Sequence, residues 1–330
     1  MKLGWPIEIV GTGARLPSTV VTNADLAQRV ETDSEWIVQR TGIRERRIAA
    51  PDESTLLLAT DAGRAALASA GLAPRDIDLI ILGTITPEHT LPATACELQA
   101  ALGCGWVPAY DLVAACSGFV WAFLSAAQSL TTGLANTVLV VGAETLSRIT
   151  DPQDRGTCIL FGDGAGAAVL RRSSDPRRAL LAARWGADGS RGLLIYVPAG
   201  GAKEPATQRT VNERLHYMRM QGREVYKFAV TQMQEIIRDT CADAGVSVTD
   251  LALVIPHQSN LRIIQSACER VGLPPEKVLI NIDCYGNTSA ASVAVALHEA
   301  RTQGRCKTGD LVMLVAFGAG LTWGSLLLRV

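Results

Sequence analysis

The sequence predicts an α/β protein built from two similar halves. Short apolar runs rich in Val, Ile and Leu, bounded by Gly or Pro, alternate with longer Ala-rich amphipathic stretches. This alternation is typical of parallel strands buried between helices. With 330 residues, of which 48% are hydrophobic, the chain is long enough for two domains or one large duplicated unit.

The first half contains the predicted strands IEIVGTG (7–13), LIILGTI (79–85), TVLVVGA (137–143) and AGAAVLR (165–171). The stretch TLLLATDAGRAALASAG (55–71) between them is a predicted helix. The charged, Pro-containing segment RRSSDPRR (171–178) then interrupts the pattern and predicts a linker.

The second half repeats the closing elements of the first. The order small-residue turn, buried helix, apolar strand and final strand occurs at 117–172 and again at 288–330. We therefore expect two halves, residues 1–171 and 172–330, whose pseudo-twofold axis brings the turns at Cys116 and Asn287 to one central cleft. The irregular segment 197–221 is predicted to be a surface excursion over this cleft.

Composition and charge exclude several function classes. The 31 basic and 32 acidic residues give a net charge of -1, so no global field attracts nucleic acid or an anionic membrane. The sequence shows neither a signal peptide nor an apolar stretch long enough to span a bilayer, which predicts a cytoplasmic protein. Its eight cysteines are scattered without a CxxC pair and should be reduced, and no residue cluster has the spacing of metal ligands.

Cys116 is the candidate nucleophile, because it stands between strand-like YDLVAA and the small, apolar run SGFVWAFLSAAQ. A helix N-terminus there would favour an anion and lower the pKa of the thiol. The alternative is a buried structural cysteine in a tightly packed helix. The small neighbouring residues fit both interpretations, because they allow close helix packing and also let a substrate approach the sulfur.

His257 and Asn287 each lie in a turn that follows a strand-like run. Alone, the histidine is more often a hydrogen-bonded structural residue, and the asparagine is more often a left-handed turn residue. Together with Cys116 they suggest acyl transfer. The segment GAGLTWG (318–324) adds small residues that let a backbone N–H reach a developing oxyanion.

Two glycine-rich segments argue against a nucleotide cofactor. GTGARLP (11–17) lacks the third glycine of GxGxxG, and FGDGAGAAVL (161–170) leads into a strand instead of a helix. A nicotinamide dehydrogenase is therefore disfavoured.

The motifs AACSGF, PHQSNLRI and GNTSAAS resemble those of the β-ketoacyl-[acyl-carrier-protein] synthase III family. The resemblance extends from TNADL and DSEWIVQRTGIRERRIA through DPQDRGT and FGDGAGAAVL to FGAGLTWGS, nearly the whole chain. It implies a thiolase-like αβαβα fold of two duplicated halves, a homodimer, and no organic cofactor. It also implies decarboxylative condensation of an acyl-CoA primer with malonyl-acyl carrier protein, which initiates type II fatty-acid synthesis.

The resemblance also implies roles for individual residues. Cys116 resembles the acylated nucleophile, and His257 and Asn287 resemble the pair that stabilises the enolate. The other matching positions are decarboxylation and oxyanion residues Phe317 and Ala319, CoA contacts Trp36, Arg40, Thr41, Arg155, Gly222 and Asn260, and carrier-protein contacts Lys227 and Arg262. Leu91 matches a position that reaches across the dimer interface to close the partner's primer pocket, with Leu160, Met220 and Tyr226 as the alternative limits.

Two departures from the family pattern affect these expectations. Ala319 replaces a glycine found in many relatives, although a backbone donor survives that change. Cys268, Glu269 and Arg270 stand where some relatives place two lysines, which weakens the match at the carrier-protein surface.

Three other functions can be compared with the sequence. A specialised relative on the same fold, which primes a secondary metabolite or transfers the acyl group to another nucleophile, would carry the same three residues. A degradative thiolase would need a second cysteine near the final glycine turn, and FGAGLTWG has none. A non-catalytic CoA or carrier-protein scaffold need not keep all three reactive residues together.

Overall fold

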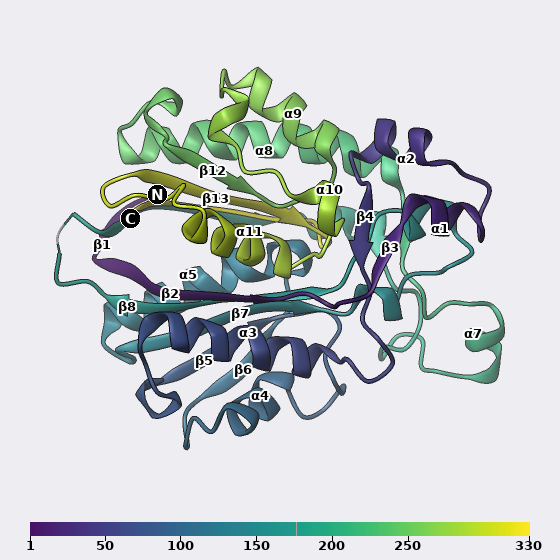
Figure 1. Cartoon of the computed structure of the whole chain (residues 1–330), viewed down its shortest axis with the longest axis horizontal. Coiled ribbons are helices and arrows are strands. Elements are labelled where there is room, and N and C mark those ends of the chain that lie inside the picture. Colours follow the sequence, from purple (N-terminus) through teal and green to yellow (C-terminus); the bar gives the residue numbers. More distant parts are fainter. Residues whose placement is uncertain (176) are drawn as a thin grey trace.

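The computed structural model describes residues 1–175 and 177–330. Two five-stranded sheets alternate with three layers of helices, so the order through the molecule is αβαβα (Figure 1). The arrangement confirms the predicted α/β class and the layered order.

The first sheet has the strand order β2-β8-β7-β5-β6. β5 pairs in parallel with β6 and β7, whereas β8 pairs antiparallel with β7 and β2. The expected parallel arrangement therefore holds for β5, β6 and β7 and is wrong for β2 and β8. Helical crossovers connect β5, β6 and β7, which allows these strands to run parallel. Among the described residues no long helix links β7 to β8, so β8 returns antiparallel to β7. The strands are β2 (Ile7–Arg15), β5 (Leu79–Gly83), β6 (Ala109–Leu112), β7 (Thr137–Glu144) and β8 (Gly164–Arg172).

The second sheet, with the order β1-β9-β14-β13-β12, repeats this pattern. β12 and β13 are parallel, and β13 and β14 are antiparallel, as β5, β7 and β8 are in the first sheet. β1, from the start of the chain, pairs with β9 in this sheet, and the division at residue 171 stays a prediction. The strands are β1 (Lys2–Trp5), β9 (Ala179–Ala187), β12 (Leu253–Pro256), β13 (Leu311–Gly318) and β14 (Thr322–Arg329).

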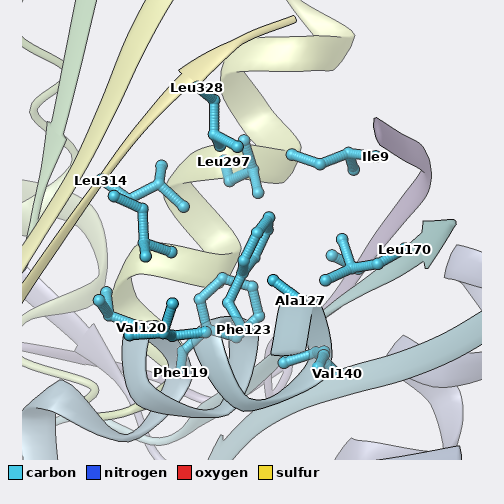
Figure 2. Packing of buried hydrophobic residues seen from close by; sticks show 14 of the residues in the cluster. Ile9, Phe119, Val120, Phe123, Ala127, Val140, Leu170, Leu297, Leu314 and Leu328 are labelled. Carbon is cyan, nitrogen blue, oxygen red and sulfur yellow. The ribbon is translucent and has the colours of Figure 1, made fainter. Parts of the chain in front are cut away.

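Helices α5 (Gly118–Thr132) and α11 (Ala291–Thr302) form the central layer between the sheets. Figure 2 shows Phe119 and Phe123 of α5 between apolar side chains of both sheets. A Cβ on Gly142 of β7 would lie 2.3 Å from the carbonyl oxygen of Ala290, so only glycine lets the α11 turn approach this strand. Close packing therefore accounts for the small residues at both turns.

Two pairs of helices cover the outer faces of the sheets (Figure 1). The helix predicted at 55–71 is α3, which packs on β2 and β8. It begins after the N-cap Ser54 and ends at Gly71, whose φ of 65° is left-handed. The outer helices are α3 (Thr55–Ala70) and α4 (Thr94–Leu102) on the first sheet, and α8 (Gly222–Ala244) and α9 (Leu261–Arg270) on the second.

Short elements surround one end of the sheets. They are α1 (Asn23–Ala27), α2 (Ser34–Thr41), α6 (Arg155–Cys158), α10 (Ile282–Tyr285) and the strand pair β3 (Val20–Thr22) and β4 (Glu45–Arg47). The buried guanidinium of Arg46 joins three of these segments, because it donates to Val21 O, Asn23 Oδ1 and Ile159 O. It thereby holds the segment before Phe161 in place.

The irregular segment predicted at 197–221 includes the short helix α7 (Gln208–Asn212), which projects from the body of the molecule (Figure 1). Its base is the two-stranded pair β10 (Ile195–Tyr196) and β11 (Arg219–Met220). The predicted linker 171–178 connects β8 to β9, although Arg171 and Arg172 belong to β8 and Pro176 lies outside the described residues. Within the described ranges, no helix is long and apolar enough to cross a membrane.

Candidate active site

Cys116 lies in a single 3-10 turn, Ala115–Ser117, between β6 and α5. Ala115 has a left-handed φ of 46°, and Ser289, just before α11, has a φ of 48°. Ala115 directly precedes Cys116, and Ser289 follows Asn287 by two residues, so a constrained backbone accompanies each of the two turns. The equivalence of these turns stays a prediction.

A cavity of about 380 Å³ joins residues that are far apart in the sequence. Cys116, His257 and Asn287 all line it, so the structure brings the three candidate residues together. Ten further predicted residues also line it: Trp36, Arg40, Thr41, Leu160, Met220, Gly222, Tyr226, Asn260, Phe317 and Ala319.

His257 follows β12 and is almost completely buried. Its backbone N–H donates to the carbonyl oxygen of Val315 at 2.7 Å, and its ring meets Phe317 edge to face with centroids 5.6 Å apart. Burial lowers the pKa of His257 to about 3. The imidazole is therefore neutral at physiological pH.

Ser292 contacts one ring nitrogen of His257. The Nδ1 atom of His257 lies 2.6 Å from the Ser292 hydroxyl oxygen, which also accepts the backbone N–H of Gln258 at 3.3 Å. The Ser292 oxygen can accept that N–H and still donate its own hydrogen to Nδ1. In that arrangement the proton of the neutral ring is on Nε2. The sequence analysis missed Ser292, although it is the last residue of the GNTSAAS motif.

Asn287 is held at the cavity by its own backbone. Its N–H donates to the Leu160 carbonyl oxygen at 2.8 Å, and its carbonyl oxygen accepts the N–H of Gly162 at 3.0 Å. The side-chain Oδ1 accepts the Ser289 N–H at 2.9 Å. The amide nitrogen of Asn287 is therefore left free to donate a hydrogen bond.

The pKa of the Cys116 thiol differs from the expected one. Burial, more than any other cause, raises its pKa to about 12, whereas the sequence analysis predicts a lowered value from the helix N-terminus. The Ser289 hydroxyl lowers this pKa, and the negative charge of Glu144 raises it further. The expectation was wrong because desolvation of a thiolate outweighs a helix end that begins two residues later.

The end of β13 lies directly against Cys116. A Cβ on Gly318 would be 2.7 Å from the Cys116 backbone nitrogen, so this position needs glycine. The hydroxyl oxygen of Thr322 lies 3.1 Å from Ala114 O and 3.0 Å from Ala319 O, so its hydrogen can be shared between these two carbonyl oxygens. This threonine therefore fixes the Ala319 turn relative to the Cys116 turn, and residue 319 lines the cavity.

One end of the cavity is cationic and aromatic. The guanidinium carbons of Arg155 and Arg40 lie 5.0 and 5.6 Å from the ring centroid of Trp36, within cation–π range. Asn260 donates to the Arg40 carbonyl oxygen at 3.0 Å. Arg155 itself is not among the residues that line the cavity, but it covers Trp36, which is.

Besides Arg155, three predicted residues lie outside the cavity. Leu91 is 86% exposed and does not line the cavity of its own chain. Arg262 and Lys227 are exposed, and the Lys227 ammonium lies 2.9 Å from the Glu224 carboxylate. Their suggested contacts therefore concern other molecules and stay predictions.

The layered fold and the cysteine, histidine and asparagine at one cavity define the class of the protein. It is a thiolase-fold acyltransferase of the condensing type. A model of the family 3-oxoacyl-[acyl-carrier-protein] synthase III matches residues 110–189, and a model of its C-terminal part matches residues 241–330.

Individual relatives agree with the family models. The β-ketoacyl-[acyl-carrier-protein] synthase III of Symbiobacterium thermophilum is 52% identical over 98% of both chains. The crystal structure of the enzyme with this family name from Aquifex aeolicus superposes with a TM-score of 0.91 at 48% identity, over 98% of this chain and 100% of that one. A priming β-ketosynthase from the R1128 polyketide pathway gives a TM-score of 0.89 at 34% identity, over 98% and 96%. The chain belongs to the β-ketoacyl-[acyl-carrier-protein] synthase III family.

Proposed function

We propose that this protein condenses a short acyl-CoA with malonyl-acyl carrier protein and so initiates type II fatty-acid synthesis in the cytoplasm. The products are 3-oxoacyl-acyl carrier protein, CoA and carbon dioxide. The observation that carries the proposal is the meeting of Cys116, His257 and Asn287 at one enclosed cavity in a member of this family. The alternative of a specialised relative is not favoured, because the curated relatives near 50% identity carry the fatty-acid enzyme's name.

Cys116 is the proposed nucleophile of the first half-reaction. Its sulfur attacks the acyl-CoA carbonyl carbon, and CoA leaves as the thiolate and takes up a proton. The backbone N–H groups of Cys116 and Ala319 are the proposed donors to the oxyanion. Support comes from Gly318, which brings the end of β13 against the Cys116 nitrogen.

His257 and Asn287 are the proposed donors of the second half-reaction. Malonyl thioester loses carbon dioxide, and its enolate oxygen accepts hydrogen bonds from Nε2–H and from the Asn287 amide. With the Ser292 hydroxyl donating to Nδ1 and the Ser289 N–H bonded to the Asn287 Oδ1 atom, both groups can act as donors. The enolate carbon then attacks the acyl group on Cys116, while Phe317 keeps water from the edge of the His257 ring.

The end of the cavity near Trp36 is the proposed CoA site. The indole ring and the Arg155 guanidinium can hold the adenine between them, with Arg40 as a further cation. Thr41, Gly222 and Asn260 are the proposed pantetheine contacts along the wall toward Cys116. The reaction requires no organic cofactor and no metal.

A homodimer is the proposed assembly. β6 is an edge strand of the first sheet, and Tyr110 and Val113 beside it are exposed apolar residues. The exposed side chain of Leu91 is available to a partner's primer pocket, next to the wall formed by Leu160, Met220 and Tyr226. Arg262 and Lys227 are the proposed contacts for the acidic carrier protein.

One experiment tests the activity directly. The protein is incubated with acetyl-, butyryl- and isobutyryl-CoA, the adduct is located by peptide mass spectrometry, and each adduct is chased with malonyl-acyl carrier protein. We expect acylated Cys116 and a 3-oxoacyl-carrier product. A stable adduct that malonyl-carrier protein does not consume would contradict the condensation.

A further inference from the structure

Glu299 of α11 accepts a hydrogen bond at each of its two carboxylate oxygens. Its Oε1 atom accepts the Tyr285 hydroxyl at 2.7 Å, and its Oε2 atom accepts the side-chain amide of Asn281 at 2.7 Å. These donors stand at the two ends of α10, because Asn281 is its N-cap and Tyr285 is its last residue. Hydrogen bonds to a charged acceptor are stronger than neutral ones, so the carboxylate holds both ends of α10 against α11.

The connection from α10 to Asn287 is short and closely packed. Asn287 follows Tyr285 by two residues, and Gly286 between them has a left-handed φ of 66°. A Cβ on Gly286 would lie 2.8 Å from the Leu160 carbonyl oxygen. Such packing leaves little room for α10 to move without Asn287, so the bond between Tyr285 and Glu299 bears on the position of the Asn287 amide.

Gln258 connects the same segment to His257. It follows His257 directly and is 1% exposed. Its Oε1 atom accepts the Asn281 backbone N–H at 3.1 Å, and its Nε2 atom donates to Pro256 O at 2.8 Å and Leu279 O at 3.0 Å. All three partners are backbone groups with fixed donor or acceptor roles, which determines the orientation of the amide. The His257 turn is thus bonded to the segment that leads into α10.

We call Gln258, Asn281, Tyr285 and Glu299 the linking network, because their hydrogen bonds run from the His257 turn to the Asn287 turn. None of the four residues lines the cavity. Their side chains make no hydrogen bond to the Cys116 turn, 115–117, which lies within the described ranges. The network therefore lies behind the two donors and away from the nucleophile.

The proposed decarboxylation requires both donors at one oxygen atom. An enolate oxygen can accept from His257 and Asn287 together only if their spacing stays within about 0.5 Å of the productive one. The backbone N–H of His257 is bonded to Val315 O in β13. That of Asn287 is bonded to Leu160 O, in a different part of the fold. These backbone bonds do not join the two donors, whereas the linking network does.

We propose that Glu299 is a positioning residue, which through the linking network holds His257 and Asn287 at the spacing that lets both donate to one enolate oxygen. This inference rests on the proposed function. Glu299 neither touches the substrate nor exchanges a proton with it. Acylation of Cys116 uses neither donor in the proposed mechanism, so the loss of Glu299 should affect the second half-reaction selectively.

The test measures both half-reactions in Glu299→Ala. Alanine removes both hydrogen bonds of the carboxylate and is the best helix former, so α11 should be retained. The malonyl chase of acylated Cys116 should slow at least about tenfold, and single-turnover acylation should stay within about threefold of the native rate. The loss should lie in kcat of the chase and not in KM for malonyl-acyl carrier protein, because the enolate forms only after that substrate has bound.

Glu299→Gln is the conservative variant. A glutamine Oε1 atom can accept from the Asn281 amide while its Nε2 atom donates to the Tyr285 hydroxyl oxygen. Both contacts can therefore persist, and the chase should recover to within about threefold of the native rate. Glu235→Ala is the matched control, because it changes an exposed glutamate of α8, and both of its half-reactions should be native.

Tyr285→Phe tests the network with the carboxylate in place. It removes the hydroxyl but keeps the ring, whose centroid lies 5.9 Å from the Arg47 guanidinium carbon. Alone it should slow the chase at least about threefold, and in the Glu299→Ala background it should add less than about twofold, because its partner is already absent. This variant decides the question if Glu299→Ala does not fold.

The outcomes separate this inference from the proposed function. If the native protein forms no acyl-Cys116 or does not consume malonyl-acyl carrier protein, the proposed function fails and this inference with it. If the native protein does both and the chase is native in Glu299→Ala or in Tyr285→Phe, the function stands and Glu299 does not position the donors. Equal losses in both half-reactions, or fully additive effects of the two substitutions, would also overturn the inference.

Discussion

The Nδ1 atom of His257 lies 2.6 Å from the hydroxyl oxygen of Ser292, and that oxygen also accepts the N–H of Gln258. The pair connects the residue after β12 to the first turn of α11. The hydroxyl keeps its own hydrogen, which it can donate to Nδ1, and the ring then presents Nε2–H to a ligand. We expect Ser292 to act in this way as a positioning residue for His257.

Ser292→Ala should lower the rate of malonyl decarboxylation about tenfold. The variant loses a hydrogen bond to Nδ1 worth about 1.4 kcal/mol, which favours the His257 tautomer with its proton on Nε2. Acylation of Cys116 should change little. Nitrogen chemical shifts of His257 report the tautomer directly and should show a mixture in the variant. Ser129→Ala, which removes a hydroxyl bonded within α5, is the control. An unchanged ring tautomer would contradict the assignment.

Cys116→Ala should abolish both acylation and condensation, because no other sulfur lines the cavity beside His257 and Asn287 except the thioethers of Met218 and Met220. The measurement is intact-protein mass after incubation with acyl-CoA. One stoichiometric acyl group on another cysteine would show that the nucleophile has been misassigned.

His257→Ala and Asn287→Ala should separate the half-reactions. Each variant removes one hydrogen-bond donor to the enolate. In comparable sites the loss of such a donor raises the activation free energy by about 3 kcal/mol, so the decarboxylation rate should fall about 100-fold. Acylation should fall much less, because neither group is hydrogen-bonded to the Cys116 thiol. Rapid-quench measurements of each half-reaction check this, and equal losses in a folded variant would refute the division.

Gly318→Ala should impair the site while the fold is retained. The added Cβ would lie 2.7 Å from the Cys116 nitrogen, so the nucleophile turn must move and both half-reactions should slow by about tenfold or more. Gly201→Ala is the control, because an added Cβ there meets nothing within 4 Å. Native activity in a folded Gly318→Ala protein would show that this close approach does not constrain Cys116.

Leu91→Phe should narrow the primer range. A larger side chain at the end of the partner's pocket should lower kcat/KM for butyryl- and isobutyryl-CoA but leave kcat/KM for acetyl-CoA unchanged. Each buried methylene of the primer contributes at most about 0.8 kcal/mol to binding, which limits the size of the effect. Leu134→Phe changes an equally exposed leucine at the end of α5 and serves as the control. If a dimeric Leu91→Phe protein keeps its profile, then Tyr226, Leu160 or Met220 limits the pocket.

Local sequence determined the elements and the chemistry of the site. The apolar runs predicted β2, β5, β7 and β8, and the amphipathic stretch at 55–71 predicted α3. The turns at Cys116, His257 and Asn287 were also found from their neighbours. These features are readable because strand and helix periodicity and turn residues act within about a dozen positions.

Tertiary structure alone decided the rest. The antiparallel direction of β8, the pairing of β1 with β9, and the partnership of Ser292 with His257 each join segments that are distant in the sequence. The same holds for the pKa of Cys116, which the sequence analysis expected to be low and which burial and Glu144 raise. Ionisation depends on all the atoms within a few ångströms, and no periodicity in a single chain says which distant residues will supply them.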